Sequence, residues 1–148
     1  MTPLEYRLAV IESAKAWLGT PWHHMARVRG AGVDCAQLFM ATYSDAGVIA
    51  PFEFEPYPED WMLHRSEERL MHIVQHYADE VQRPLPGDVA LFRFGHCHAH
   101  GAVVVEWPLI IHAYRVEGEV VWGDASQGLL ADRKVRFFDA VSRLPGGA

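Results

Sequence analysis

Cys35 follows a turn and opens a predicted helix within the stretch Gly32-Val33-Asp34-Cys35-Ala36-Gln37-Leu38-Phe39. Asp34 is a favourable N-cap, because its carboxylate can accept hydrogen bonds from the free N–H groups of the first turn. Cys35 then lies at the positive end of the helix dipole, where we expect the thiol pKa to fall below its free value. This position makes Cys35 a candidate nucleophile. A small buried hydrophobe is the alternative role of a free cysteine.

A cysteine nucleophile needs an imidazole to exchange protons with it, and a polar group to orient that imidazole. His100 opens one predicted strand and His112 closes the next. In a tight hairpin the end of one strand lies beside the beginning of its partner, so these two imidazoles can meet at one edge of the sheet. Cys35, His100 and His112 therefore form the candidate catalytic constellation. Three other histidines lie on or near an amphipathic helix and are expected to face solvent: His64, His72 and His76.

The elements that must position these groups divide the chain into a helical part, about 1–82, and a sheet part, about 88–140. Helices are predicted from Pro3 to Leu18, from Cys35 to Ala46 and from Glu67 to Val81, the last capped by Ser66. We expect the first helix to bury Leu4, Leu8, Ile11, Ala14 and Leu18, and the third to bury Leu70, Ile73, Val74 and Tyr77.

Strands are predicted where short runs rich in β-branched and aromatic residues follow at close spacing: 89–94, 101–107, 109–114, 120–123 and 135–138. Gaps this short cannot hold crossover helices, so the pairing should be antiparallel. Residues 22–32 indicate a loop, and 51–61 an ordered surface excursion without regular structure. The sequence thus predicts a single α+β domain over 1–148, with helices packed on one face of an antiparallel sheet of about five strands.

The composition is that of an ordinary globular protein, with 50% hydrophobic and 22% charged residues among 148. A net charge of -6 with scattered Lys and Arg argues against a nucleic-acid partner. The chain has no apolar run long enough to span a bilayer and no signal-peptide pattern, so we expect cytoplasmic synthesis and no membrane partner. Cys35 and Cys97 do not make a disulfide framework, and a bridge between them would consume the candidate nucleophile.

Five motifs in order resemble the NlpC-type family of papain-like cell-wall peptidases: Thr20-Pro21-Trp22, Gly32-Val33-Asp34-Cys35, Leu85-Pro86-Gly87-Asp88-Val89, His100-Gly101-Ala102-Val103-Val104 and Ile111-His112-Ala113. The resemblance covers about 17–113. It implies a papain-like fold, with a helix that carries Cys against an antiparallel sheet that carries His. It also implies hydrolysis, without a cofactor or metal, of peptide bonds in peptidoglycan stem peptides, often between D-γ-glutamate and a diamino acid.

The resemblance also implies a role for each matched residue. Cys35 becomes the nucleophile, His100 the general base and acid, and His112 the group that orients His100. Asp34 matches a position that caps the helix and can face a substrate's free amine. Trp22 matches an aromatic that lines the cleft near the oxyanion, for which the Cys35 backbone N–H is a natural donor.

Two departures from the family pattern lie next to these residues. Ala36-Gln37 replaces the usual Ser-Gly after the cysteine, which removes a hydroxyl that could contact the substrate. Trp22-His23-His24 replaces an aromatic-Gly-Gly element and changes the cleft wall. Neither departure touches the triad.

The loop before Cys35 and Tyr57-Pro58-Glu59-Asp60-Trp61 resemble the branch encoded in phages and prophages, often beside tail genes. This implies phage tail proteins as partners, and a location in a phage tail or release at the cell wall. One alternative is a structural tail-tip component with little or no peptidase activity. Another is acyl transfer or amide hydrolysis on other substrates, which uses the same triad.

A zinc site is a further alternative, because the sequence clusters imidazole and thiol ligands. The candidate ligands are His96, Cys97, His98 and His100, together with His23 and His24. Alternating ligands on one short segment seldom point at one ion, and the sequence contains no paired Cys-x-x-Cys motif.

Overall fold

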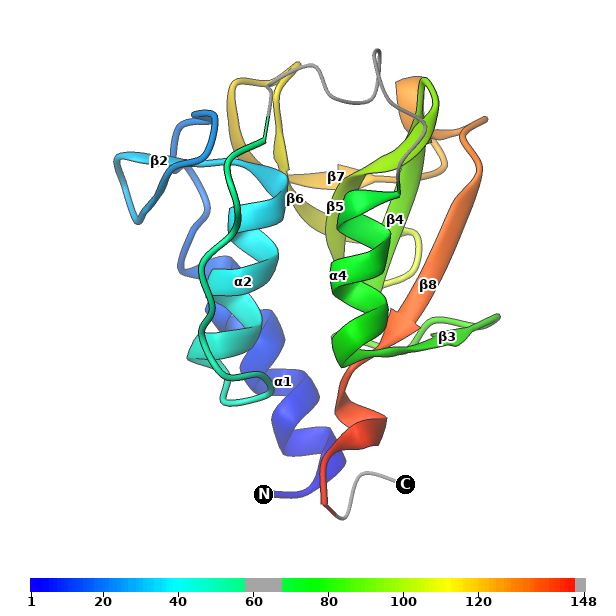
Figure 1. Ribbon diagram of the computed structural model, residues 1–148. Helices are drawn as coiled ribbons and strands as arrows, with labels where there is room; N and C mark the ends of the chain where they lie inside the picture. The colour runs from blue at the N-terminus through cyan, green and yellow to red at the C-terminus, as the bar shows by residue number, and fades with distance from the viewer. Residues whose placement is uncertain (58–67, 146–148) are drawn as a thin grey trace.

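A computed structural model describes residues 1–57 and 68–145 of the chain (Figure 1). The described residues form three α-helices, α1 (Pro3–Lys15), α2 (Cys35–Asp45) and α4 (Arg69–Tyr77), which lie together on one side of a sheet (Figure 1). The sheet has six strands in the order β3-β8-β4-β5-β6-β7, and every neighbouring pair is antiparallel. The α+β architecture predicted from the sequence is therefore confirmed.

The strands of this sheet are β3 (Asp79–Val81), β4 (Val89–Phe94), β5 (Cys97–Glu106), β6 (Leu109–Tyr114), β7 (Glu119–Asp124) and β8 (Val135–Asp139). A separate hairpin consists of β1 (Arg27–Val28) and β2 (Gly32–Val33), and two short 3-10 helices cover Gly128–Leu130 and Val141–Arg143. All five predicted strands are present. The sixth, β3, is an edge strand that the sequence pattern did not indicate.

The sheet buries apolar residues on both faces. The larger core lies between the helices and the sheet and includes Val10, Leu38, Leu91 and Val103. A smaller cluster without any α-helix residue includes Ala90, Phe92, Val104 and Ile110 from the strands, and Leu130 from the 3-10 helix after β7. Both faces are therefore fixed by packing, which holds β5 and β6 rigidly in register where the candidate histidines lie.

Arg7 of α1 joins the helices to the sheet. Its guanidinium donates to Asp88 Oδ1 at 2.8 Å and to Asp139 Oδ2 at 2.7 Å. Asp88 directly precedes β4, and Asp139 is the last residue of β8. In the same region the Tyr43 hydroxyl of α2 donates to the Gly87 carbonyl at 2.8 Å. Burial raises the pKa of Asp88 to about 6, against the lowering effects of the Leu85 N–H and Arg7. This buried group of charges fixes how the helices sit on the sheet.

The predicted buried face of the first helix is wrong in part. Leu4 and Leu8 are 63% and 52% exposed, while Arg7, Val10, Ile11 and Ala14 are buried. The face that turns inward begins at Arg7, because the buried carboxylates of the sheet attract its guanidinium. The helix also ends at Lys15, three residues before the predicted end at Leu18, and a tight turn follows it.

The predicted third helix is shorter than expected. It ends at Tyr77, because Ala78 adopts extended φ and ψ of -143° and 152°, and the chain continues directly into β3. Residues 22–32, predicted as a loop, contain β1 and the start of β2. Residues 51–57 form no regular element, as predicted. Three further expectations fall outside the described residues: the end of the 51–61 excursion, the exposure of His64 and the Ser66 cap.

Candidate active site

Asp34 holds the start of α2 as the sequence predicts. Its Oδ1 accepts a hydrogen bond from the Gln37 N–H at 2.9 Å, which is the bond of a helix N-cap. Its Oδ2 accepts from the Met25 N–H at 2.8 Å and from the Tyr57 hydroxyl at 2.6 Å. The carboxylate therefore ties together the loop before β1, the 51–57 segment and the helix whose first residue is Cys35.

The Cys35 thiol is partly buried, and its Sγ donates to the Ala99 carbonyl of β5 at 3.3 Å. Burial, followed by the negative charge of Asp34, raises the pKa of Cys35 to about 12. Backbone N–H groups of Gly101, Ala36 and Cys35 itself lower the pKa by less. The expected fall in the thiol pKa is therefore wrong for the free protein: the helix-start amides act in the expected direction, but desolvation outweighs them.

The two candidate imidazoles are in contact. Nε2 of His100 and Nδ1 of His112 are 2.8 Å apart, and the rings meet edge-on with centroids 5.0 Å apart. His100 does not open its strand as predicted; it lies within β5, opposite Phe92 of β4. The link therefore joins the interiors of β5 and β6, where packing on both sheet faces restricts the rings.

Both imidazoles are neutral near pH 7. Burial, followed by the neighbouring His112, holds the pKa of His100 well below its ordinary 6.5. Burial lowers the pKa of His112 to about 4. In a neutral pair one ring nitrogen of the contact donates and the other accepts. Because Nε2 of His100 is engaged by His112, Nδ1 is the nitrogen that remains for exchange with a thiol.

Aromatic rings surround His100 on several sides. Phe92, Phe94 and Tyr114 have ring centroids 5.9, 5.7 and 5.4 Å from its own. Tyr114 also stacks on His112 at 4.6 Å with an interplanar angle of 20°. These rings supply the low-dielectric surroundings that keep the imidazoles neutral. The sequence analysis did not select Tyr114, although it lies two residues after His112 and so on the same face of its strand.

A cavity of about 450 Å³ brings most of the predicted site residues together. Its lining includes Trp22, Asp34, Cys35 and His100, all of which the sequence analysis had named. Tyr57, Phe94, Tyr114 and Arg115 also line it and were missed. His112 does not line this cavity and contacts it only through His100. The volume is in the range of small-molecule and peptide subsites.

Opposite charges lie in the wall of this cavity. The exposed Arg115 guanidinium lies over the Trp22 ring, 5.1 Å from its centroid. The backbone N–H of Trp22 donates to the Gly118 carbonyl at 2.8 Å and holds the residue in place. Beside Cys35, the acidic residue Asp34 is 4% exposed. The cavity thus presents a cation stacked on an aromatic ring and a buried anion to a bound molecule.

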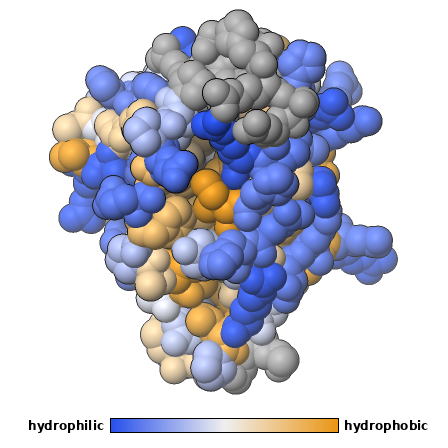
Figure 2. Space-filling model, in the orientation of Figure 1, coloured by the Kyte–Doolittle hydropathy of each residue, from blue (hydrophilic) through white to orange (hydrophobic). Residues whose placement is uncertain are grey.

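A second cavity of about 500 Å³ adjoins the first and shares Ala36 and Tyr57 with it. It lies between the 51–57 segment and α4, with Phe52, Phe54 and Ile73 in its lining. Figure 2 shows apolar surface in this region beside the hydrophilic outer face of α4.

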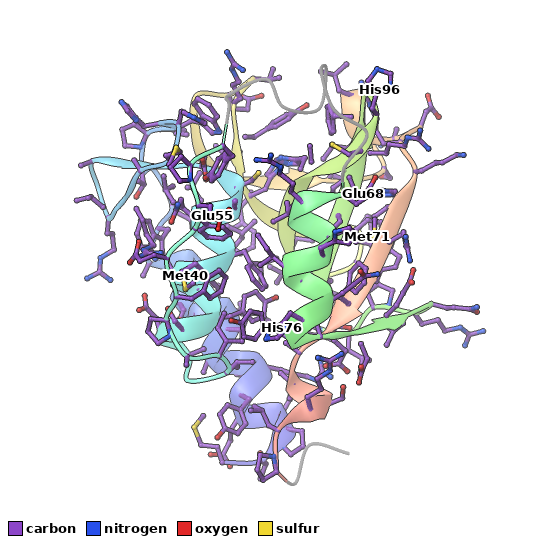
Figure 3. The ribbon with its side chains drawn as sticks, in the orientation of Figure 1. Met40, Glu55, Glu68, Met71, His76 and His96 are labelled. Atoms are coloured by element: carbon purple, nitrogen blue, oxygen red, sulfur yellow. The ribbon has the colours of Figure 1, made fainter. Side chains whose placement is uncertain are left out.

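The histidine-rich segment 96–100 is not gathered into a metal site. His98 Nδ1 lies 3.1 Å from Oε2 of Glu68, at the start of α4 beside β5 (Figure 3). Within 1–57 and 68–145, no group of three or more His, Cys, Asp or Glu side chains is arranged to hold a metal ion. Cys35 and Cys97 are both free thiols. No helix in the described part of the chain is long and apolar enough to cross a membrane.

Neither a protein-family model nor a curated protein sequence matches the chain. Solved structures do match. NlpC1 from Trichomonas vaginalis matches with a TM-score of 0.65 and 17% identity, over 90% of this chain and 43% of its own. The peptidoglycan hydrolase RipB from Mycobacterium tuberculosis matches with a TM-score of 0.64 and 14% identity, over 93% of this chain and 66% of its own.

A third solved structure is RipD from Mycobacterium tuberculosis, described as a non-catalytic NlpC/p60 domain protein adapted to a peptidoglycan-binding function. It matches with a TM-score of 0.58 and 14% identity, over 90% of this chain and 96% of its own. The chain thus spans less than two thirds of the length of NlpC1 and of RipB. At these identities the likeness concerns the fold, and this chain has the α+β, papain-like fold of the NlpC/P60 proteins.

Proposed function

We propose that this protein is a cysteine peptidase that hydrolyses peptide bonds in peptidoglycan stem peptides. The observation that carries the proposal is the shared cavity of Cys35 and His100, with His112 bonded to the other side of His100 at 2.8 Å. A thiol, an imidazole and an orienting group in this order are the parts of a nucleophilic acyl-transfer site. The fold likeness to RipB, a peptidoglycan hydrolase, supports the substrate class.

Acylation starts from a thiol and a neutral imidazole, as the pKa directions of Cys35 and His100 require. When the substrate carbonyl approaches Sγ, the thiol proton passes to His100 Nδ1 and a C–S bond forms. The carbonyl oxygen gains the negative charge, which the Cys35 backbone N–H stabilises. The C–N bond then breaks, and His100 returns the proton to the leaving amine.

Deacylation uses the same groups in reverse. His100 takes a proton from a water molecule, whose oxygen attacks the thioester carbonyl, and the C–S bond breaks with return of the proton to sulfur. His112 keeps Nε2 of His100 engaged throughout, so that Nδ1 faces the sulfur in both steps. The positive charge on His100 exists only between the two proton transfers, so its low pKa favours prompt return of the proton.

For the substrate we propose the bond between D-γ-glutamate and a diamino acid. Asp34 offers a carboxylate to the free amine of a stem peptide, and the Trp22 ring also lines the cavity. Gln37 is not in the cavity lining, and its side-chain oxygen accepts from Arg27 at 3.1 Å. Ala36 does line the cavity, so its contacts with the substrate should differ from those of the serine that is usual at this position.

We also propose that the protein derives from a phage or prophage and acts at the cell wall, with phage tail proteins as partners. The support is the sequence resemblance of the loop before Cys35 and of residues 57–61, of which 58–61 lie outside the described structure. A structural tail-tip role is the competing function. The non-catalytic description of RipD is an example of this fold without catalysis.

Digestion of purified peptidoglycan, followed by mass analysis of the released fragments, tests this function. We expect the wild type and Cys97→Ala to release the same stem fragments, because Cys97 is buried and lies outside the cavity. We expect Cys35→Ala to release none. Release by neither protein would favour the structural role, and equal release by the wild type and Cys35→Ala would contradict the role of Cys35 as nucleophile.

A further inference from the structure

The His112 ring occupies a slot between two neighbours. Tyr114 stacks on one face of the ring at 4.6 Å. Gly123 of β7 lies against its edge: a Cβ at Gly123 would be 2.7 Å from His112 Nε2, 3.3 Å from His112 Cδ2 and 3.3 Å from Ile110 Cγ1. Real Cβ contacts are essentially never shorter than 3.0 Å. The ring therefore fits where it does because residue 123 has no side chain.

The strand backbone does not explain the glycine. Gly123 lies inside β7, paired with Ile110, and its φ is not in the left-handed region that favours glycine. A glycine inside a strand weakens it and commonly marks a close approach of another group. Here the approaching group is the imidazole of His112, which is 2% exposed and whose Nδ1 is bonded to His100.

We propose that Gly123 is a positioning residue of the active site, which sets the place of His112 and through it the orientation of His100. Displacement of the His112 ring by a side chain at position 123 lengthens the 2.8 Å contact with His100 Nε2. His100 is then free to turn, and its Nδ1 is no longer held for proton exchange with Cys35. This inference rests on the proposed function, in which Nδ1 exchanges the proton with Cys35.

The test compares Gly123→Ala with the same substitution in a His112→Ala background, using a synthetic stem peptide as substrate. We expect Gly123→Ala to lower kcat by about 10- to 100-fold with little change in KM, the usual effect of losing a supporting contact. In the His112→Ala background, which has no ring for the methyl group to meet, we expect the same substitution to change kcat less than about twofold. Additive effects in the two backgrounds would overturn the inference.

A spectroscopic readout separates this inference from the proposed function. The ring N–H proton of the His100–His112 hydrogen bond should give a downfield NMR signal in the wild type that is shifted or lost in Gly123→Ala, whether or not the protein has peptidase activity. An unchanged signal would overturn the inference. A peptide that the wild type does not cleave would instead contradict the proposed function.

If Gly123→Ala does not fold, the double variant Gly123→Ala, His112→Ala decides the question. Folding of the double variant would show that the methyl group fails only against the imidazole, as the inference requires. Failure of the double variant to fold would assign Gly123 to the strand itself, or to packing against Ile110, and would overturn the inference.

Discussion

Replacement of Arg7 by methionine should lower the free energy of unfolding substantially, because it leaves two buried carboxylates without their cation. The side chains of Arg7, Asp88 and Asp139 are 11%, 1% and 9% exposed, with contacts of 2.8 and 2.7 Å. Removal of one member from a buried ion pair costs about 3–5 kcal/mol. For a chain of this length that corresponds to a fall in Tm of about 6–20 °C.

The loss should depend on pH in a defined direction. The pKa of Asp88 is raised from 3.8 to about 6 in the folded protein, so between these values the folded state binds the proton more tightly than the unfolded state. The contribution of Asp88 to the free energy of unfolding therefore increases as the pH falls from about 6 towards 3.8. Without Arg7 the Asp88 pKa should rise further. Arg7→Met should thus lose most stability at pH 8 and recover part of it at pH 5.

Urea unfolding at pH 8 and pH 5, followed by circular dichroism, measures this effect. Lys15→Met is the matched control, because its pair with Glu12 is exposed and such pairs contribute about 0–1 kcal/mol. A loss below about 1 kcal/mol for Arg7→Met at pH 8 would refute the buried-charge reasoning. So would a loss that grows as the pH falls to 5.

Three further predictions concern the site. Iodoacetamide should modify Cys35 before Cys97, which is 1% exposed. The rate at Cys35 should rise about tenfold per pH unit through pH 9, because the Cys35 pKa is raised to about 12. A rate that reaches a plateau near pH 7, followed by mass spectrometry, would instead reveal a preformed thiolate. Asp34→Asn should speed that alkylation at pH 8, since it removes a charge that raises the Cys35 pKa while keeping an N-cap residue; equal or slower rates would contradict this. Stem-peptide cleavage should hold its kcat/KM from pH 8 down to 6.5, because the His100 pKa lies well below 6.5; an acid limb centred at or above 6.5 would contradict the lowered pKa.

Local sequence patterns predicted two contacts of the candidate site, the Asp34 cap and the meeting of His100 with His112. The Asp34 cap follows from a carboxylate before a free helix start, and it forms as expected. His100 and His112 were paired from the hairpin they flank, and they do meet. The predicted start of the strand that carries His100 was less accurate. β5 begins at Cys97, before the apolar run, so His100 lies inside the strand and not at its start.

The features that the sequence did not predict depend on contacts between residues distant in sequence. The buried face of α1 follows Arg7, whose acidic partners lie 81 and 132 residues away, so helical periodicity alone selected Leu4 and Leu8 wrongly. The Cys35 pKa depends on how deeply the sheet covers the sulfur, which a helix-start pattern does not contain. Tyr57 and Arg115 reach the cavity from separate loops, and no sequence pattern marks either of them as a site residue.

The central claim is that the Cys35 sulfur forms a covalent bond with the acyl part of a stem peptide. Rapid acid quenching of the wild type mixed with excess synthetic peptide, followed by intact-mass measurement and peptide mapping, tests it most directly. We predict an added mass equal to the acyl fragment, located on Cys35 and absent from Cys35→Ala. Cleavage of the peptide by Cys35→Ala at the wild-type rate, with no adduct on the wild type at any time, would contradict the claim.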